Sequence, residues 1–413
     1  MNERIGALLV AALVTGAAYA KDPGRFDQQF QRNLAYRGGP VIIDHRFGSV
    51  TVRTGSTSEV GVRATVRSSD SEFGRQIQID TSAERNGVTI RTRYPERATR
   101  HSGKHSYSVD LQITVPPNAP LRVTNRFGSV NASGIAGGSE IVNGHGSIRL
   151  TDARGKQTVE NSFGSIEVRN IGGDAVVRNS HGSVRAEVIR GSADVTNRFG
   201  SVSVAEVDRG AAVKNANGSV SVRDVRGPAA VTNSFASITV QSVTGSVRAN
   251  GNNARVSVRD ARGDVEVTTS FGAVDVQNVG GTLGVANNNG SVKGSNIQGN
   301  IAVRMSFGSV TLQDLHGVVD VQNQNGAISV SRLSPAAGCR PISLRTSFSS
   351  IKVKLPANAS YAVNARTTFG QIKSAFPITT SSIGRESVAG TIGGGSCKLD
   401  LINGNGSISI DRE

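Results

Sequence analysis

The side chains best placed to bind a ligand are four arginines that recur every 36 residues. They are Arg154, Arg190, Arg226 and Arg262. If one coil of the fold has that length, the four guanidinium groups form a column with about 4.8 Å between neighbours, which is one strand spacing. Like charges in such a column repel unless nearby acids or an anionic ligand neutralise them. The row fits either a solvated face with weak local ion pairs or, as a hypothesis, a stripe that grips an extended polyanion.

Histidines offer a weaker candidate for chemistry. His145 and His181 are also 36 residues apart and would stack one above the other, which could begin a metal site. The same position further along the chain holds Asn217, Asn253 and Asn289. A position that accepts Asn as readily as His is a polar turn position, so no metal and no cofactor are predicted.

Carboxylates are the candidate catalytic groups, because parallel β-helices include polysaccharide lyases and hydrolases. Asp152, Asp224, Asp260 and Asp314 share one recurrent position before an aliphatic residue at a bend, which is typical of an Asx turn. We find no nucleotide-binding loop, zinc spacing or serine-nucleophile motif. A non-enzyme is therefore predicted. The alternative is a carbohydrate-active β-helix enzyme, which would confine a cluster of acidic and basic side chains to one or two coils.

These residues are positioned by an 18-residue repeat. From Phe127 to Asn325, every eighteenth residue is Phe, His or Asn (position zero), and Val or Ile follows three residues later. Each unit contains two short segments of alternating apolar and polar residues, which indicate half-buried strands. A strict short period is the mark of a solenoid, whose units are stable only as a stack. The fold class is therefore all-β, a right-handed parallel β-solenoid (β-helix).

The geometric coil is either 18 or 36 residues long. Position zero alternates between Phe and His or Asn, so a 36-residue coil of four strands would stack like on like, and we favour it over an 18-residue coil of two strands. An Asn row lies two residues before position zero, where Asn tolerates the left-handed turn conformation and hydrogen-bonds locally or to copies of itself in the next coil. Glycines ten residues after position zero, such as Gly173, are expected to supply backbone angles closed to other residues.

The chain divides into five segments. Residues 1–20 resemble a cleavable signal peptide, and 21–40 are a polar lead-in or short cap. Residues 41–120 hold a first copy of the repeat and a hairpin turn at Asn86-Gly87, which predicts an antiparallel cap over the open end. The regular array covers 121–334, and 335–413 form divergent coils and a C-terminal cap. Cys339 and Cys397 in that cap are most simply one disulfide.

The expected location is outside the cytoplasm, in the periplasm, on the surface or secreted, without a transmembrane anchor. A net charge of +15 favours either an anionic envelope polymer or glycan as partner, or simple solubility. A protein partner is the other possibility, and the oligomeric state is left open. Aromatic residues make up 4% of the chain and Trp is absent, which counts against stacking platforms for sugars or bases and against specific nucleic-acid binding.

The repeat also resembles a known family. The pattern Asn-x-Phe-Gly-Ser-Ile/Val-x-Val, together with the segments Val115–Val123 and Leu355–Val363, is similar to the bacterial putative-adhesin β-strand-repeat family of unknown function, which is related to adhesin head domains named for Gly-Ile-Asn. The resemblance covers roughly residues 40–413. It implies a β-solenoid at the cell envelope that serves as a binding or structural module, with no catalytic residues to carry over.

Overall fold

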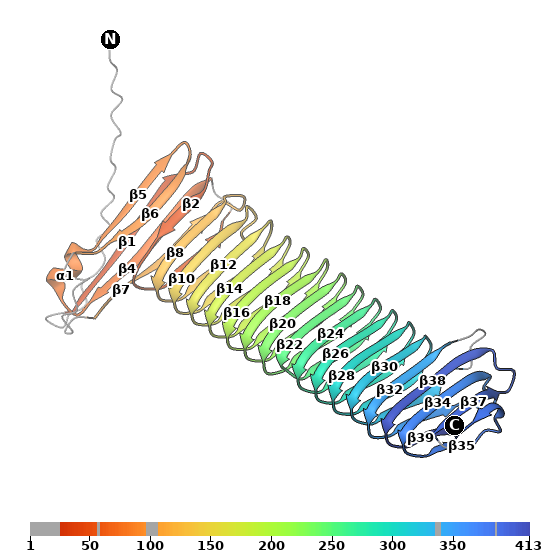
Figure 1. Ribbon diagram of the computed structural model, residues 1–413. Helices are drawn as coiled ribbons and strands as arrows, with labels where there is room; N and C mark the ends of the chain where they lie inside the picture. Colours follow the sequence, from red (N-terminus) through yellow and green to blue (C-terminus); the bar gives the residue numbers. More distant parts are fainter. Residues whose placement is uncertain (1–24, 56–57, 96–105, 335–339, 385) are drawn as a thin grey trace, which may run out of the picture.

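The chain forms one elongated solenoid with a broader N-terminal end (Figure 1). The computed structural model describes residues 25–55, 58–95, 106–334, 340–384 and 386–413. The segment predicted to be a signal peptide lies outside the described residues. A short helix, α1 (Ser71–Gln76), is capped by the Asp70 side chain, which accepts from the N–H groups of Glu72 and Phe73. The remaining elements are strands, as the all-β prediction requires.

Each regular coil is 18 residues long and places one strand in each of two parallel sheets. The strands of the first sheet (sheet B) are β8 (Leu121–Phe127), β10 (Ser139–His145), β12 (Gln157–Phe163), β14 (Ala175–His181), β16 (Ala193–Phe199), β18 (Ala211–Asn217), β20 (Ala229–Phe235), β22 (Val247–Asn253), β24 (Val265–Phe271), β26 (Leu283–Asn289), β28 (Ile301–Phe307) and β30 (Val319–Asn325). The strands of the second sheet (sheet A) are β9 (Val130–Ser133), β11 (Ile148–Ala153), β13 (Ile166–Ile171), β15 (Val184–Ile189), β17 (Val202–Val207), β19 (Val220–Val225), β21 (Ile238–Val243), β23 (Val256–Ala261), β25 (Val274–Val279), β27 (Val292–Ile297), β29 (Val310–Leu315) and β31 (Ile328–Leu333).

The register shows that the preferred 36-residue coil is wrong. Val159 pairs with Val177 in sheet B, and Ile166 pairs with Val184 in sheet A, so each residue lies beside the one 18 positions later. Two strands and two turns already close a coil. At position zero of the regular array, Phe therefore stacks on His or Asn instead of on another Phe.

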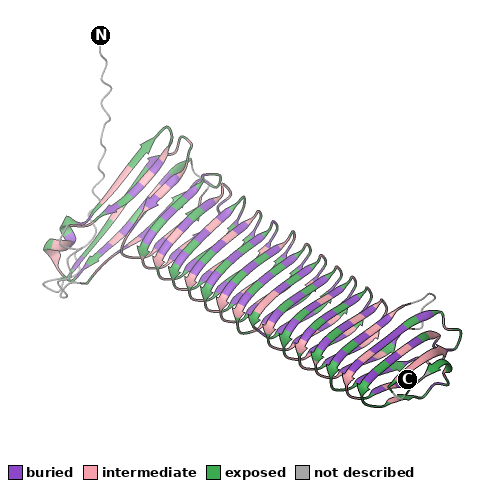
Figure 2. Ribbon diagram, in the orientation of Figure 1, coloured by how far each residue is buried: buried purple, intermediate pink, exposed green. Residues whose placement is uncertain are grey.

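The core is a thin layer between the two sheets. In the coil that begins at Phe163, three side chains of β13 point inward, and β14 contributes three more. All six are buried: Ile166, Val168, Ile171, Ala175, Val177 and Asn179. The neighbouring outward residues are half-buried or exposed, so buried and exposed positions alternate along each strand (Figure 2). One coil buries too little apolar surface to be stable alone, and pairing with the coils on both sides supplies the rest.

In every coil from β11 to β31, the residue just before the last inward residue of the sheet A strand has a left-handed backbone although it is not glycine. Its φ lies between 52° and 58°. Two successive residues there face solvent, for example Arg169 and Asn170, before Ile171 turns back into the core. Asn and Asp tolerate this conformation. Asp152, Asp224, Asp260 and Asp314 all occupy the position, so the bend is present. The expected Asx hydrogen bond does not form, because the N–H two residues after Asp152, that of Arg154, donates to the Ile135 carbonyl of the preceding coil.

The bend glycines act differently from the prediction. Gly173 does not have a positive φ, although Gly155 does, at 67°. A Cβ at Gly173 would lie 2.3 Å from the carbonyl oxygen of Gly155 in the preceding coil. Glycine is therefore required at Gly173 because two backbones approach closely, and not because of its own dihedral angles.

An antiparallel cap covers the N-terminal end, as predicted. Its strands are β1 (Phe26–Ala35), β4 (Glu59–Ser68), β5 (Gln78–Glu84), β6 (Gly87–Arg93) and β7 (Tyr107–Val115), and the first coil consists of β2 (Val41–Asp44) and β3 (Val50–Thr54). Strands β1, β4 and β7 pair antiparallel, and β5 and β6 form the hairpin at Asn86-Gly87. The first coil, β2 and β3, lies between this cap and β8 and β9.

The C-terminal end uses a similar arrangement. Its strands are β32 (Ile342–Phe348), β33 (Ile351–Leu355), β34 (Tyr361–Phe369), β35 (Ile372–Ser374), β36 (Thr379–Ile383), β37 (Ser387–Ile392), β38 (Cys397–Asn405) and β39 (Ile408–Arg412). The last coil, β38 and β39, inserts between β32–β33 and β34–β35. Antiparallel β37 and β36 then continue sheet B beyond β34. Cys397 is buried, and its predicted partner Cys339 lies outside the described residues, so their pairing stays a prediction.

Val188 provides a test of the left-handed position. A β-branched residue is strained at φ 57°, so Val188→Asn should stabilise the fold by about 1 kcal/mol. The measurement is the denaturant or thermal midpoint of unfolding. Val176→Asn is the control, because Val176 is a half-buried outward residue of β14 with ordinary strand geometry. A destabilised Val188→Asn variant would contradict the assignment.

Candidate interaction surfaces

Two turns per coil give the solenoid two long edges. At one turn the chain passes from sheet B to sheet A through position zero and the Gly-Ser that follows, and we call this side the aromatic edge. At the other turn it returns to sheet B, and we call this side the arginine edge because it carries Arg154, Arg190, Arg226 and Arg262. Any extended ligand would meet one of these edges or one of the two sheet faces.

The four predicted arginines share the arginine edge but do not form the expected column. They lie in alternate coils, and Gly172, Asp208 and Thr244 occupy the places between them. Asp208 forms ion pairs of 3.2 Å with both Arg190 and Arg226. The expected spacing of one strand between guanidinium groups is therefore wrong. Asp208 in the intervening coil, which the sequence analysis missed, neutralises the central pair.

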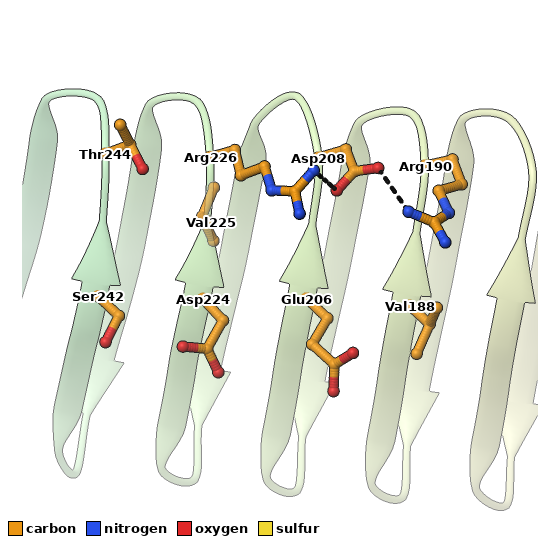
Figure 3. Close-up of a pocket in the computed structure, with 9 residues that line it drawn as sticks. All are labelled: Val188, Arg190, Glu206, Asp208, Asp224, Val225, Arg226, Ser242 and Thr244. Atoms are coloured by element: carbon orange, nitrogen blue, oxygen red, sulfur yellow. Dashed lines mark hydrogen bonds and ion pairs between the residues drawn. The ribbon is translucent and has the colours of Figure 1, made fainter.

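A shallow depression surrounds this ion-pair triplet (Figure 3). Arg190 and Arg226 point toward Asp208 from opposite sides, and Glu206 and Asp224 lie along the next row. Three carboxylates thus accompany two guanidinium groups, so the middle of the edge does not favour an anion. Among the described residues, no carboxylate is within ion-pair distance of Arg154 or Arg262. These two are the available cations of the predicted set.

The recurrent carboxylates bond to neighbouring coils. Asp152 and Asp260 accept hydrogen bonds of 2.7 Å from Asn170 and Asn278, each one coil later. Asp174 accepts from the Ser192 N–H at 2.8 Å, and this bond lowers the pKa of Asp174. A bidentate contact with Arg332 likewise lowers the pKa of Asp314. These acids therefore support the stack, as the regular spacing suggested.

His145 and His181 do not stack on each other. The ring of Phe163 lies between them, with its centroid 4.7 Å from each imidazole. In the part of the chain that the structure describes, no three His, Cys, Asp or Glu side chains gather as a metal site would require. The two histidines are members of an aromatic stack.

The N-terminal half of the aromatic edge is a continuous stack of rings. Phe47, Phe127, His145, Phe163, His181 and Phe199 follow one another with centroids 4.7–5.2 Å apart and planes within 15°. Arg46, Arg126 and Arg198 lie over the rings of Phe47, Phe127 and Phe199 at 5.3–5.4 Å. In this half the rings contact one another and three arginines, while Phe163 and Phe199 remain 46% and 38% exposed.

The C-terminal half has the same Phe spacing, but Asn replaces His. Phe235, Phe271 and Phe307 are 49–53% exposed, and beyond Phe199 no stacked ring pair occurs on this edge among the described residues. The aromatic content of 4% gives no sign of this row, because few rings suffice when the fold aligns every one of them. The strict alternation at position zero is the signal in the sequence. The prediction against stacking platforms for sugars or bases stays a prediction.

A buried ladder of amides lies beneath the aromatic edge. The Asn161 Nδ2 donates to the Gly146 carbonyl at 2.8 Å, and the Asn143 Nδ2 donates to the same oxygen at 3.2 Å. Asn161 is 2% exposed and lies within β12. The Asn row therefore ties glycine carbonyls of adjacent coils together. The local bond expected of the row is present, as from Asn143 to Gly146, but none of these residues adopts a left-handed turn.

His45 occupies the ladder position of the first coil. Its Nδ1 lies 2.7 Å from the Thr92 Oγ1, and the residue is 3% exposed. Burial lowers the pKa of His45 to about 4, and the nearby Asp110 and Asp44 charges offset this only partly. The ring is therefore neutral at neutral pH, so it can join the cap to the solenoid without burying a charge.

Comparisons with known proteins give a fold-level likeness. No family model matches the chain, and no curated protein matches it in sequence. A putative cell adhesion protein from Clostridium sporogenes is similar over 94% of this chain and 100% of its own, at 8% identity and TM-score 0.19. A putative adhesin from Bacteroides fragilis is similar over 65% of this chain and 97% of its own, at 9% identity and TM-score 0.21. Among the described residues, no helix has the length and apolarity needed to cross a membrane.

Asn161→Asp tests the amide ladder. The change removes the donor to Gly146 and buries a carboxylate beside a carbonyl oxygen, which should cost about 3 kcal/mol or more at pH 7. The loss should shrink near pH 4, where the carboxyl becomes protonated. Asn161→Thr is the control and should cost much less, because Thr346 makes the equivalent bond to Gly326 at 3.1 Å. The free energy of unfolding at both pH values is the measurement, and equal losses for Asp and Thr would refute the ladder.

His45 predicts a pH dependence. The unfolded state takes up a proton near pH 6.5 but the folded state only near pH 4. Stability is thus fully present above pH 6.5 and falls as the pH drops from 6.5 to 4, by roughly 3 kcal/mol at about 1.4 kcal/mol per pKa unit. His45→Asn places the usual ladder residue there and should flatten this part of the unfolding profile. Identical profiles for parent and variant would exclude the effect.

Proposed function

We propose that the protein is an exported, non-enzymatic, adhesin-like β-solenoid that serves as a binding or structural module at the bacterial cell envelope. The observation that carries this proposal is the uninterrupted 18-residue register from β8 to β30. Side chains form rows along the whole length, which suits an extended partner better than a small substrate. The resemblance of the repeat to the putative-adhesin family supports the same interpretation.

The carbohydrate-active enzyme is less well supported. The charged group around Asp208 spans few coils, as an active site would, but each member occupies an ordinary repeat position. Glu206 and Asp224 are the left-handed residues of their coils, and Asp208 is held by two arginines. No insertion breaks the repeat there to form a substrate cleft. Rows that obey the repeat favour a binding surface.

We further propose that an anionic envelope polymer or glycan binds along the arginine edge. The turn residues of this edge include six basic and three acidic side chains: Arg154, Lys156, Arg190, Arg209, Arg226, Arg262, Asp174, Asp208 and Asp264. Asp208 engages the central arginines, so Arg154 and Arg262 are the cations that a polyanion would contact. They stand on either side of the neutralised centre.

Paired double variants test this proposal. The double variant Arg154→Gln, Arg262→Gln should bind a long polyanion such as heparin about tenfold more weakly at low salt. The slope of log affinity against log salt concentration should also become smaller in magnitude by about 1–2. Arg190→Gln with Arg226→Gln is the matched control and should change affinity less than about threefold, because Asp208 already neutralises these charges. Asp208→Asn should strengthen binding. A variant that combines all four Arg→Gln changes should bind more weakly than the parent. Equal binding of this variant and the parent would end the polyanion proposal.

A further inference from the structure

The C-terminal half of the aromatic edge presents rings at a regular interval. In the order of the coils, its exposed rings are Phe235, Phe271, Phe307, Phe348 and Phe369, which are 49–69% exposed. Asn253, Asn289 and Asn325 separate the first four, and Asn405 separates Phe348 from Phe369. With a strand spacing of about 4.8 Å, successive Phe rings are about 9.6 Å apart.

The N-terminal half shows what fits between two such rings. There the imidazoles of His145 and His181 fill the interval, with centroids 4.7–4.9 Å from the Phe rings on both sides. Asn has a shorter side chain and no ring, so each interval over Asn253, Asn289 or Asn325 lacks the middle ring of the stack. We call these three positions the ring-free intervals. A ring from another molecule would restore the stack of the N-terminal half.

The charge of this edge narrows the choice of partner. Ser, Gly, Ala, Asn and Gln dominate the residues beside position zero from Asn217 to Asn325, and Arg255 is the charged exception. The chain as a whole carries +15. A partner recognised by charge would avoid this edge, whereas two like-charged molecules could approach each other here with the least repulsion.

We propose that a second copy of this chain docks antiparallel along the C-terminal half of the aromatic edge, with the Phe rings of each copy inserted into the ring-free intervals of the other. The partner must offer rings every two coils along a straight rod, and this chain does so itself. An antiparallel two-fold pairing closes on a dimer. This interface lies on the edge opposite the arginines and does not depend on polyanion binding.

The available area is sufficient for a specific dimer. A buried Phe covers roughly 200 Å², so five half-exposed rings contribute about 500 Å² per copy. The Asn and Ser side chains between and beside the rings bring the total for both copies to the lower end of standard interfaces, about 1,200 Å². An interface of this size and ring content supports a dissociation constant in the micromolar range.

Sedimentation equilibrium of the full chain tests the proposal. The decisive comparison is a variant in which histidine side chains fill the ring-free intervals. The triple variant Asn253→His, Asn289→His and Asn325→His places in each interval the residue that stands at 145 and 181. It should fold, because His145 and His181 fit the same position. It should also weaken dimerisation at least tenfold, because the intervals are filled from within.

If the edge associated only through non-specific apolar contacts, the histidine variant would give the opposite result. The histidines add ring surface, so association would increase. The triple variant Phe235→Ser, Phe271→Ser and Phe307→Ser removes the rings and should also abolish the dimer. The proposal is overturned if the parent stays monomeric at about 200 µM, well above a micromolar dissociation constant, or if the histidine variant dimerises as well as the parent. Neither outcome bears on heparin binding, which is measured separately.

Discussion

In-register pairing of each residue with the one 18 positions later is the constraint on which the structure depends. It aligns Val159 with Val177 and Ile166 with Val184, so the small aliphatics of every coil continue the same core rows. It also brings backbones so close at the turns that Gly173 has no room for a Cβ. Because no coil is stable alone, a change at one repeated position acts on the coils above and below it.

The ends of the stack are protected by the order of the chain. The first coil lies inside the antiparallel cap, and the last coil, β38 and β39, inserts between two earlier coils. Neither the first nor the last coil therefore presents an open parallel edge. The outermost strands instead include β1, β5 and β36, each of which pairs on one side only among the described residues. Exposed strand edges invite pairing with other chains, and here these three edges belong to antiparallel strands at the two ends of the stack.

The same register that builds the core also decides the character of the two edges. On the arginine edge it places Asp208 between Arg190 and Arg226 and leaves Arg154 and Arg262 available. On the aromatic edge it aligns Phe with His in one half and Phe with Asn in the other. One backbone geometry thus yields an edge of paired and unpaired charges and a ring-bearing edge whose C-terminal half has few charges.

The solenoid, its inward Val and Ile rows and the antiparallel cap could be predicted from the sequence, because the period of 18 and the alternation of polarity fix which residues share a face. The coil length could not be predicted in this way. Pairing Ile166 with Val184 or with Val202 would bury the same face, so polarity could not distinguish 18 from 36 residues. The choice rests on closure: two strands and two turns already complete a coil, and this placed Asp208 between two arginines and Phe163 between two histidines.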